Sequence, residues 1–398
     1  MAGPLPRATE TGIRVHAGID EIPPEAWNAL VDPRYPFLRH EFLAAAERHR
    51  CAAPETGWTP CHLALYEAGE LLGAMPLYEK THSWGEFIFD WAWADAYRRA
   101  GLAYYPKLVS AVPFTPATSQ RVLTRGPDAG EHRAALLAGL VAHARDANLS
   151  SGHVLFPTRE ELPALEEAGF HVRKDCQFQW RNRGYADFDE FLGDFSSAKR
   201  KKARRERRRV AEAGIRFRNL AADQLSEAGW AEVFRLLSHT FMRRGNLPYL
   251  GLEFFLELRR TLPSALRVIV AEDDGGIVAA AVFYRGSDTL YGRYWGSDED
   301  YHSLHFETCY YQGIEYCIEE GIALFEPGTQ GEHKIRRGFL PTATWSAHWL
   351  AHPQFAAAVG RYLDEERGHV DDYIAAAAAH SPFRSDLPGA REVPGQDG

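Results

Sequence analysis

The sequence of 398 residues is poor in cysteine and gives its cysteines no recognisable spacing. There are five, an odd number, and none belongs to a Cys-x-x-Cys pair. This pattern argues against a disulfide framework and against a structural zinc site. It is typical of reduced, mostly buried thiols, and we therefore expect a cytoplasmic protein. The five residues are Cys51, Cys61, Cys176, Cys309 and Cys317.

Long apolar runs are missing as well. No stretch reaches the roughly 18 residues that a membrane-spanning helix needs, so we expect no membrane span. Residues 1–11 lack the basic-then-apolar pattern of an export signal. The sequence contains no motif of phosphate loops, dinucleotide folds, zinc proteases or serine hydrolases. His302 and His305 have no cysteine or carboxylate partners at ligand spacing, so we expect no metal.

Charge is unevenly distributed along the chain, whose net charge is −9. Between Lys199 and Arg209, nine of eleven residues are basic and one, Glu206, is acidic. This run carries +8 and leaves −17 for the rest of the chain. A mildly acidic protein with one concentrated cationic segment indicates a local anionic partner.

The basic run is expected to form a helix over residues 197–213, between capping serines and Gly214. Two interpretations remain open: a solvated helix that bears a like-charge penalty, or an arm that binds phosphates of tRNA, a nucleotide-linked precursor or CoA. The candidate phosphate-binding residues are Lys199, Arg200, Lys201, Arg204, Arg205 and Arg208.

Two parts of the chain repeat the same pattern of short strands around a turn. Residues 63–78 form two β-rich runs on either side of Ala68-Gly69, and residues 269–284 do so around Gly275-Gly276. This is the pattern of a β-hairpin. In each copy a strand-like stretch and then a helix follow. The strand-like stretches are residues 84–93 and 289–295, and the helices are residues 132–147 and 305–320.

Beyond these helices the two copies run in step at an offset of 169 residues. Leu155-Phe156 matches Leu324-Phe325, Gly169-Phe170 matches Gly338-Phe339, and Trp180 matches Trp349. Each copy therefore has a strand, one or two helices, a three-stranded meander, a helix, a strand, a further helix and a last strand. That order predicts an α/β fold with a mixed sheet, antiparallel early and parallel after the central helix.

The length of the chain also favours two domains over one. We expect an N-terminal domain over residues 10–182 and a C-terminal domain over residues 183–385, which includes the basic helix. Residues 386–398 are rich in proline and glycine and are expected to form a flexible tail.

Nine short motifs connect this sequence with a known family. They are Gly73–Tyr78, His82–Glu86, Phe89–Tyr97, Tyr105–Leu108, Val112–Pro116, Arg200–Arg207, Gln330–Lys334, Arg337–Pro341 and Ser346–Trp349. The order of elements resembles two N-acetyltransferase (GNAT) domains in tandem, as in the Fem family of peptidoglycan-bridge aminoacyltransferases. With these motifs the chain most resembles a FemAB-like family of N-acyltransferases. The resemblance covers residues 15 to 380 and implies acyltransferase activity.

The resemblance leaves the acyl donor open between aminoacyl-tRNA and acyl-CoA, with no covalently bound cofactor. CoA-dependent GNAT enzymes carry Arg/Gln-x-x-Gly-x-Gly/Ala before the central helix, where backbone N–H groups bind pyrophosphate. Neither residues 112–119 nor residues 296–303 match it, and the second loop holds Asp298, Glu299 and Asp300. Such carboxylates would repel the pyrophosphate of CoA at this loop. Fem enzymes use aminoacyl-tRNA and also lack a good CoA loop, so the resemblance favours aminoacyl-tRNA as the donor.

The loop that follows the strand at residues 323–326 holds the candidate catalytic residues Glu332, His333 and Lys334. Acyl transfer to an amine requires that the amine lose a proton and that the developing oxyanion be stabilised. Glu332 or His333 is suited to accept the proton, and Lys334 to stabilise negative charge. The alternative is a polar helix N-terminus in which Glu332 complements the helix dipole.

Aromatic residues with interspersed charges provide candidate substrate contacts. Asp90, Trp93 and Asp95 lie in the first copy, where core tryptophans and a turn are the alternative. Arg293 of the second copy is suited to a carboxylate or phosphate, or else to a structural ion pair. The remaining candidates in the second copy are Tyr291, Trp295, Arg336 and Arg337.

His305 and Cys309 lie four residues apart on one predicted helix face, but a core thiol is the preferred interpretation over a nucleophile. The leading hypothesis is direct transfer of an acyl or aminoacyl group to an amine, on a peptidoglycan precursor or a related small molecule. The alternatives are an acyl-CoA-dependent N-acyltransferase and a non-catalytic protein that binds tRNA or a cell-wall precursor. Oligomeric state is not predicted.

Overall fold

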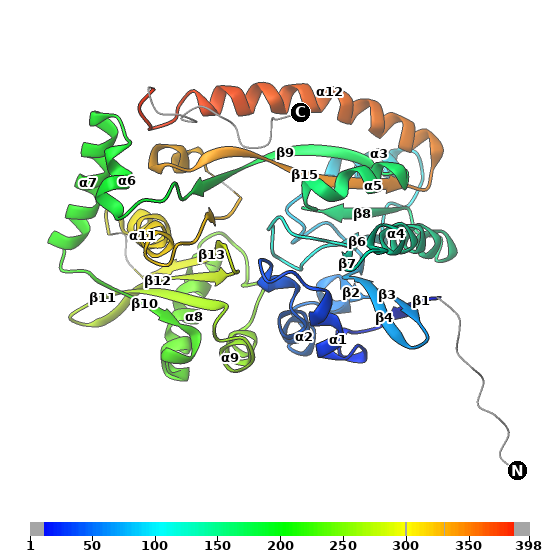
Figure 1. The fold of residues 1–398 in the computed structure, drawn as a ribbon, viewed down its shortest axis with the longest axis horizontal. Coiled ribbons are helices and arrows are strands. Elements are labelled where there is room, and N and C mark those ends of the chain that lie inside the picture. The colour runs from blue at the N-terminus through cyan, green and yellow to red at the C-terminus, as the bar shows by residue number, and fades with distance from the viewer. Residues whose placement is uncertain (1–11, 299–300, 330, 386–398) are drawn as a thin grey trace, which may run out of the picture. The chain divides into compact units, whose positions relative to one another are not determined.

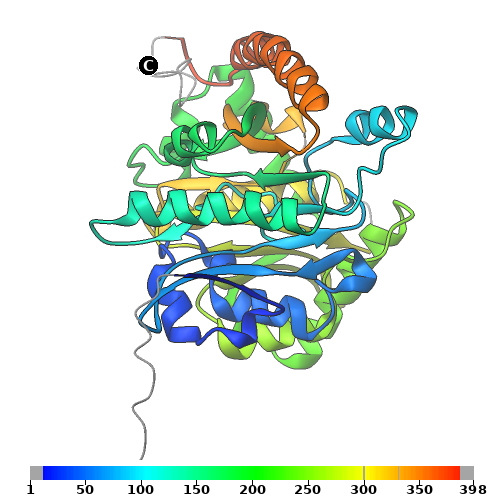
Figure 2. The same cartoon turned by 90° about the vertical axis from the view of Figure 1, so that its right-hand side faces the viewer.

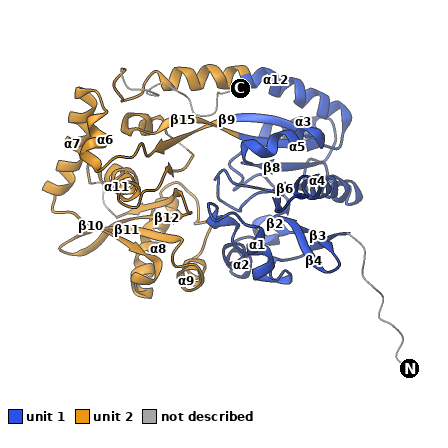
Figure 3. Ribbon diagram, viewed as in Figure 1, with its two compact units in different colours: residues 1–174, 345–367 blue, residues 175–344, 368–398 orange. Residues whose placement is uncertain are grey.

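The computed structural model of the protein describes residues 12–298, 301–329 and 331–385. Two compact units divide it: unit 1 comprises residues 1–174 and 345–367, and unit 2 comprises residues 175–344 and 368–398 (Figure 3). The expected domains, residues 10–182 and 183–385, are contiguous, whereas these units exchange segments. Strands β9 (His171–Arg181) and β15 (Leu340–Leu350) each carry the chain from one unit into the other. The expected tail, residues 386–398, lies outside the described residues.

Unit 1 contains two sheets. The first has the order β1-β3-β4-β7 and is antiparallel, and the second has the order β15-β8-β6-β5-β2. The predicted hairpin turn at Ala68-Gly69 is confirmed between β3 and β4. The strands are β1 (Gly12–His16), β2 (Trp58–Pro60), β3 (His62–Glu67), β4 (Glu70–Met75), β5 (Tyr78–Lys80), β6 (Lys107–Ser110), β7 (Leu123–Thr124) and β8 (Ser151–Leu155).

Helix α4 (Ala129–Asp146) covers the strands of the first sheet (Figure 2). Its buried side chains Leu136, Leu137, Leu140 and Ala144 recur at helical spacing and pack into the core of unit 1. Burial of each large side chain contributes roughly 1.5–3 kcal/mol. The other helices of unit 1 are α1 (Pro24–Leu30), α2 (His40–Arg48), α3 (Trp91–Arg99) and α5 (Leu162–Glu167). Helix α12 (Pro353–Ala378) begins in unit 1 and ends in unit 2.

The expected strand over residues 84–93 is wrong. The chain forms an irregular loop there and then enters α3. Trp93 and Tyr97 of α3 are four residues apart and pack on Val359 and Leu363 of α12, which supplies the apolar surface that a helix needs. Residue Phe87 has a left-handed backbone (φ 59°), which no regular strand accommodates.

Unit 2 is built on one sheet with the order β10-β11-β12-β13-β14-β9. Its first strands are antiparallel, and β13 and β14 are parallel, pairing Thr289 with Leu324 and Tyr291 with Glu326. The predicted mixed sheet is therefore confirmed. The strands are β10 (Arg216–Ala221), β11 (Leu266–Asp273), β12 (Gly276–Arg285), β13 (Thr289–Ser297) and β14 (Leu324–Glu326).

The helices of unit 2 pack on both faces of this sheet (Figure 1). They are α6 (Phe188–Gly193), α7 (Ser197–Glu212), α8 (Glu227–Met242), α9 (Leu252–Thr261), α10 (Leu304–Phe306), the π-helix η6 (Glu307–Tyr311), α11 (Gln312–Glu319) and the 3-10 helix η7 (Glu332–Arg337). Strand β13 lies so close to α8 that a Cβ at Gly296 would overlap the backbone of Leu236. Glycine is required at that contact because it has no side chain.

Candidate functional site

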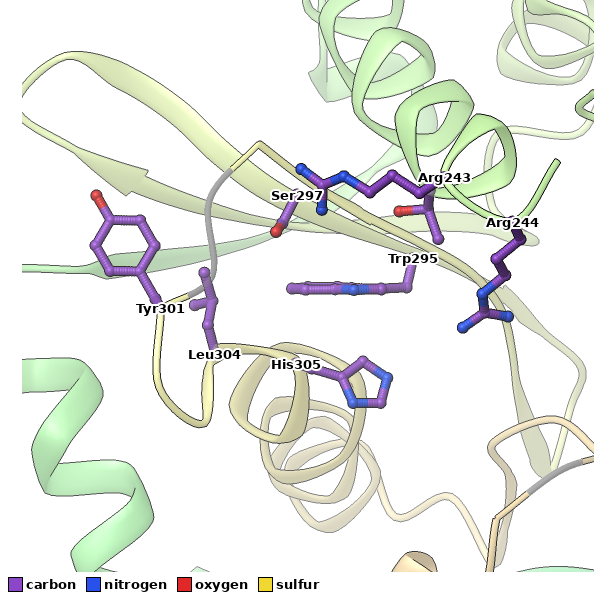
Figure 4. Close-up of a pocket in the computed structure, with 8 residues that line it drawn as sticks. Arg243, Arg244, Trp295, Ser297, Tyr301, Leu304 and His305 are labelled. Atoms are coloured by element: carbon purple, nitrogen blue, oxygen red, sulfur yellow. The ribbon is translucent and has the colours of Figure 1, made fainter. Parts of the chain in front are cut away.

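A cavity of about 280 Å³ lies in unit 2 between the end of α8, strand β13 and α10, and we call it the Trp295 cavity (Figure 4). Two arginines approach it from α8, and Leu304 and His305 approach it from α10 on the other side of the Trp295 ring. The lining residues are Thr240, Arg243, Arg244, Trp295, Ser297, Tyr301, Leu304 and His305.

The Trp295 cavity combines cations with a neutral imidazole. The ring of His305 lies edge-on to Trp295, with centroids 5.3 Å apart. Burial, with smaller contributions from His333 and Arg337, lowers the pKa of His305 to about 4. The imidazole is therefore uncharged near neutral pH, and the positive charge of the cavity comes from Arg243 and Arg244.

The carboxylate of Asp298 beside this cavity is neutralised. Arg235 donates to Asp298 through both terminal nitrogens, one at 2.7 Å, and the Nδ1 atom of His239 lies 2.9 Å from Oδ1. The hydrogen bond from Arg235 lowers the pKa of Asp298. The expected repulsion of a phosphate by this loop therefore does not arise from Asp298. Glu299 and Asp300 lie outside the described residues.

A second cavity in unit 2, of about 390 Å³, lies between α7, α10 and η7, and we call it the basic cavity. It joins the basic helix to the loop with the candidate catalytic residues, two features that are more than a hundred residues apart in the sequence. Its lining residues are Lys202, Arg205, Glu206, Arg209, His302, Ser303, Phe306, His333, Arg336 and Arg337.

Glu206, the acid within the basic run, anchors η7 to α7. Arg337 donates to both carboxylate oxygens of Glu206 at 2.9 Å, and the Tyr311 hydroxyl donates to it at 2.6 Å. The guanidinium of Arg337 also lies 3.3 Å from the ring centroid of Phe306. Arg337 is therefore occupied by a buried ion pair, while Arg336 is exposed at the cavity.

Helix α7 confirms the predicted helix and packs one narrow face, Ala203, Glu206 and Val210, into unit 2. Several of its cations already have partners. Arg207 pairs with Glu307 and Glu315, both at 3.0 Å or less. Helix α7 is therefore not fully exposed to solvent, and not all of its cations are free to bind phosphates.

The six candidate phosphate-binding residues of α7 have different environments. Arg204 pairs with Asp189 at 2.9 Å, and Arg200 donates to the carbonyl of Gly193 at 3.2 Å. Arg205 lines the basic cavity. Lys201 and Arg208 are exposed on the solvent side of the helix together with Arg204, and Lys199 is half-buried.

The three candidate catalytic residues point in different directions, because successive residues of a 3-10 helix are about 120° apart. Glu332 is exposed and accepts a hydrogen bond from the Tyr373 hydroxyl at 3.1 Å. His333 faces the basic cavity, and its Nε2 lies 2.9 Å from the Tyr310 hydroxyl. Lys334 is buried and donates through Nζ to the carbonyl of Gly328 at 2.5 Å.

The charges of His333 and Lys334 are reduced by their surroundings. Burial lowers the pKa of His333, and the neighbouring Lys334 and Arg337 lower it further. Burial, with Arg293 nearby, lowers the pKa of Lys334 to about 7. His333 is thus a neutral imidazole able to accept a proton, and Lys334 is only partly charged near neutral pH.

Gly331 gives His333 its position. The glycine has φ 108°, and a Cβ there would overlap the imidazole of His333, which folds back over it. A side chain at residue 331 would displace the ring.

The candidates on β13 differ in their exposure. Tyr291 is buried in the core, and Trp295 lines the cavity named after it. The side chain of Arg293 is buried, and its Nη2 lies 3.7 Å from Oε2 of Glu326. Gln179 donates to the other oxygen of Glu326 at 2.8 Å. The structural ion pair, one of two open alternatives, is therefore present for Arg293.

In unit 1, Asp90 belongs to a buried charged cluster centred on Lys107, which we call the Lys107 cluster. The Lys107 ammonium donates to Asp90, to Glu86 at 2.8 Å and to the hydroxyl of Ser83 at 3.0 Å. Tyr104 donates to Asp90 at 2.6 Å. Burial alone would raise the pKa of Asp90, but the charge of Lys107, with smaller contributions from His153 and from the hydrogen bonds of Lys107 and Ser83, lowers the pKa to about 2.

Two buried histidines extend this cluster. The Nε2 atom of His153 lies 3.3 Å from the Tyr104 hydroxyl, and its Nδ1 lies 2.7 Å from Nδ1 of His348. Trp93 lies edge-on to His348. Burial lowers the pKa of His153 to about 3, so the pair is uncharged. Asp95 does not join them: it is paired with Arg98 and Arg99 on the outer face of α3.

Sequence reasoning missed several residues of these sites, most of which lie far along the chain from at least one of their partners. The signal that could have found Arg243 and Arg244 is an arginine pair that directly follows the last residue of α8. The residues of unit 2 that are not named as site candidates are Lys202, Arg209, Arg243 and Arg244, while His302 and His305 are considered only for a metal and His305 also as a partner of Cys309. Burial raises the pKa of the Cys309 thiol well above its usual range, in agreement with a core thiol. The missed residues of unit 1 are Glu86, Lys107, His153 and His348.

The repeated order of elements and the mixed sheets define the class: an α/β protein with two GNAT-type units in tandem. The sequence profile of the FemAB-like family, described as peptidoglycan biosynthesis or recognition, matches residues 18–385. The chain therefore belongs to the FemAB-like family, as its motifs predicted. No sequence among the curated proteins matches the chain.

Solved structures to which this chain is similar include proteins of different names. The C-terminal domain of a protein from Agrobacterium fabrum named as a lysylphosphatidylglycerol synthetase is 12% identical with a TM-score of 0.52, over 85% of this chain and 95% of that chain. FemX is 11% identical with a TM-score of 0.49, over 78% and 92%. A tandem GNAT protein of the clavulanic acid pathway is 13% identical with a TM-score of 0.45, over 86% and 99%. With 12% identity and a TM-score of 0.52, the first of these structures supports the fold alone.

Among the residues that the structure describes, no helix has both the length and the apolar character needed to cross a membrane.

Proposed function

We propose that unit 2 transfers an acyl or aminoacyl group from a phosphate-bearing donor to an amine. The observation that carries this proposal is the basic cavity, where cations of α7 and η7 surround His333. Among the described residues, no carboxylate forms an ion pair with Arg205 or Arg336, so these two charges are available to a ligand. Family membership supports a peptidoglycan precursor or a related small molecule as the acceptor.

The donor's phosphates would lie in the basic cavity and its acyl group toward the Trp295 cavity. The two cavities meet at α10, since His305 lines one and its neighbour Phe306 lines the other. Four basic side chains, Lys202, Arg205, Arg209 and Arg336, line the basic cavity in addition to the paired Arg337. Their spread over two elements suits a run of phosphodiesters, which favours aminoacyl-tRNA over the alternative donor, acyl-CoA.

The chemistry requires one proton transfer and one bond exchange. The amine nitrogen forms a bond to the donor's carbonyl carbon, the ester or thioester bond breaks, and the leaving oxygen or sulfur takes up a proton. His333 is the group best suited to accept the proton from the amine, because its imidazole is neutral and its Nε2 is held by Tyr310. Lys334 fixes the loop through Gly328 and adds partial positive charge for the developing oxyanion.

The test compares two neighbouring residues of η7 that differ in direction. With charged tRNA and an amine acceptor, His333→Gln should lower kcat by about 10²-fold or more, as expected for loss of a general base. Glu332→Gln serves as the matched control and should change kcat by less than about 3-fold, because Glu332 contacts Tyr373 on the outer side. Full turnover in both variants would overturn the assignment of this loop.

Two alternatives give different results in simple assays. An acyl-CoA donor predicts a rise in melting temperature with acyl-CoA and none with charged or deacylated tRNA. A non-catalytic binding protein predicts tRNA binding without any product detectable by mass spectrometry. A cytoplasmic location, where both donors are made, is part of the proposal, and the five free cysteines support it.

A further inference from the structure

Three large aromatic side chains are exposed in unit 1, two on the loop that precedes α3 and one at the first residue of α3. Trp84 is 60% exposed, Phe89 is 64% exposed and Trp91 is 41% exposed. The rings of Trp84 and Trp91 are in contact, with centroids 5.5 Å apart. We call residues 84–91 the aromatic loop. Contiguous exposed aromatic surface is unusual on a protein and marks a site of interaction.

Buried side chains of unit 1 hold the loop in this exposed conformation. Lys107 binds the side chains of Ser83, Glu86 and Asp90, so that all three polar groups turn inward. Lys80 donates to the carbonyl of Trp84 at 3.2 Å, and its Nζ lies 3.9 Å from the Trp58 ring.

Further along the loop, Arg173 donates to the carbonyl of Phe89 at 2.8 Å, and Phe87 holds a left-handed backbone. A loop free to rearrange would bury its aromatic rings to escape water. Buried charges hold this loop open instead.

The charged and apolar side chains around the aromatic loop indicate the chemistry of its partner. Helix α3, which continues the loop, packs its inner face on α12 and leaves its outer face bare (Figure 2). Its last turn carries Arg98 and Arg99, both exposed, against the single acid Asp95, and Leu102 follows at 40% exposure. The exposed surface is thus apolar with a small net positive charge.

A glycan does not fit this surface, because the polar side chains of the loop face inward and offer nothing to sugar hydroxyls. The two tryptophans are also inclined at 61° and form no common stacking plane. Tryptophan and phenylalanine beside arginine are, in contrast, the residues that partition into the headgroup region of a bilayer.

We propose that the aromatic loop docks the protein on an anionic lipid surface, with Trp84, Phe89 and Trp91 in the headgroup region and Arg98 and Arg99 at the lipid phosphates. The chain as a whole carries −9, so the attraction is local and the docking is reversible and salt-sensitive. This proposal is independent of the transfer reaction assigned to unit 2.

The experiment measures partition of the full chain onto phosphatidylcholine vesicles with and without about 30% phosphatidylglycerol. The variant Trp84→Ala/Phe89→Ala/Trp91→Ala should bind the anionic vesicles with an affinity lowered by roughly tenfold or more, because interfacial binding scales with the apolar area inserted. The matched control Val15→Ala/Leu247→Ala removes exposed apolar surface elsewhere in the chain and should bind as the unmodified protein does. Arg98→Gln/Arg99→Gln should reduce the preference for anionic over neutral vesicles.

A conservative variant distinguishes the loss of lipid contacts from misfolding of the triple variant. In Trp84→Phe/Trp91→Phe, vesicle binding should persist, while quenching of tryptophan fluorescence by brominated lipid should be lost. The proposal is overturned if the unmodified protein does not bind anionic vesicles, or if the triple variant binds as well as it does. It is equally overturned if the exposed rings instead mediate self-association in lipid-free solution, or sedimentation with insoluble glycan.

Discussion

Units 1 and 2 each gather charged side chains, but they use these charges in opposite ways. In unit 1 the ammonium of Lys107 is fully buried and bound by two carboxylates, Glu86 and Asp90. In unit 2 the acid Glu206 is bound by Arg337 and lies 3.9 Å from Lys202, and the other cations of the basic cavity line it. Buried charges that satisfy one another are costly to separate, whereas charges that line a cavity are available to a ligand. This contrast between the units supports our proposal that the chemistry belongs to the second copy.

The largest expected effect concerns the Lys107 cluster. Lys107→Met should lower the free energy of unfolding by about 3–5 kcal/mol, because Asp90 would be left as a buried charge without its cation and Glu86 would lose its hydrogen-bond donor. Urea unfolding followed by fluorescence measures the loss. Lys199→Met, at a half-buried cation of α7, is the control and should change stability by less than about 0.5 kcal/mol.

Equal effects from these two substitutions would contradict the contrast between the units. A loss of stability in Lys107→Met alone would support the contrast between the units, since both variants replace one ammonium by an apolar side chain of similar length.

A smaller, pH-dependent effect is expected at Lys334, a buried cation of unit 2 without a carboxylate partner among the described residues. Its pKa falls from 10.5 to about 7 on folding. Between these values the unfolded chain binds a proton that the folded chain does not, so stability rises with pH over that range. Below pH 7 both states are protonated, and the penalty is complete.

Lys334→Met should therefore raise stability relative to the unmodified protein most at about pH 6 and least at about pH 10. Unfolding by urea at both pH values measures the difference. A pH-independent difference would show that Lys334 carries no buried charge.

The smallest expected effect concerns the solvent side of α7. Arg204 and Arg208 are four residues apart and of like charge, which destabilises a helix by about 0.2–0.5 kcal/mol per pair. Arg208→Gln should raise the melting temperature slightly at low salt, and the gain should vanish at high salt because salt screens exposed charges. Glu212→Gln, on the same helix, should give no gain. A loss of stability in Arg208→Gln would mean that α7 is held by charges not available to a ligand.

The sequence predicts much of the fold because the repeat is encoded in local patterns. Hairpin turns at Ala68-Gly69 and at Gly275-Gly276, and the helix between its capping serines and Gly214, depend on neighbouring residues alone. The segment over residues 84–93 escapes prediction because its helix depends on contacts with α12, more than 250 residues further along the chain.

The candidate site is predicted less well than the fold, for the same reason. The loop with Glu332, His333 and Lys334 stands out in the sequence as a cluster of polar residues. The three side chains nevertheless point in different directions, because the segment forms a 3-10 helix. Lys107 is an isolated lysine in the sequence, and its two carboxylates lie 17 and 21 residues away. Isolated residues become a cluster only once strands and loops bring them together.

The most direct measurement is the salt dependence of tRNA binding in the unmodified protein and in Arg205→Gln/Arg336→Gln. The exposed arginines of the control Arg260→Gln/Arg361→Gln lie outside both cavities. We expect log K to fall with log salt with a slope of roughly −3 to −4, reduced by about 2 in the cavity variant and unchanged in the control. Binding insensitive to salt between roughly 50 and 200 mM, or an equal slope in all three proteins, would contradict the assignment of the basic cavity as the donor site.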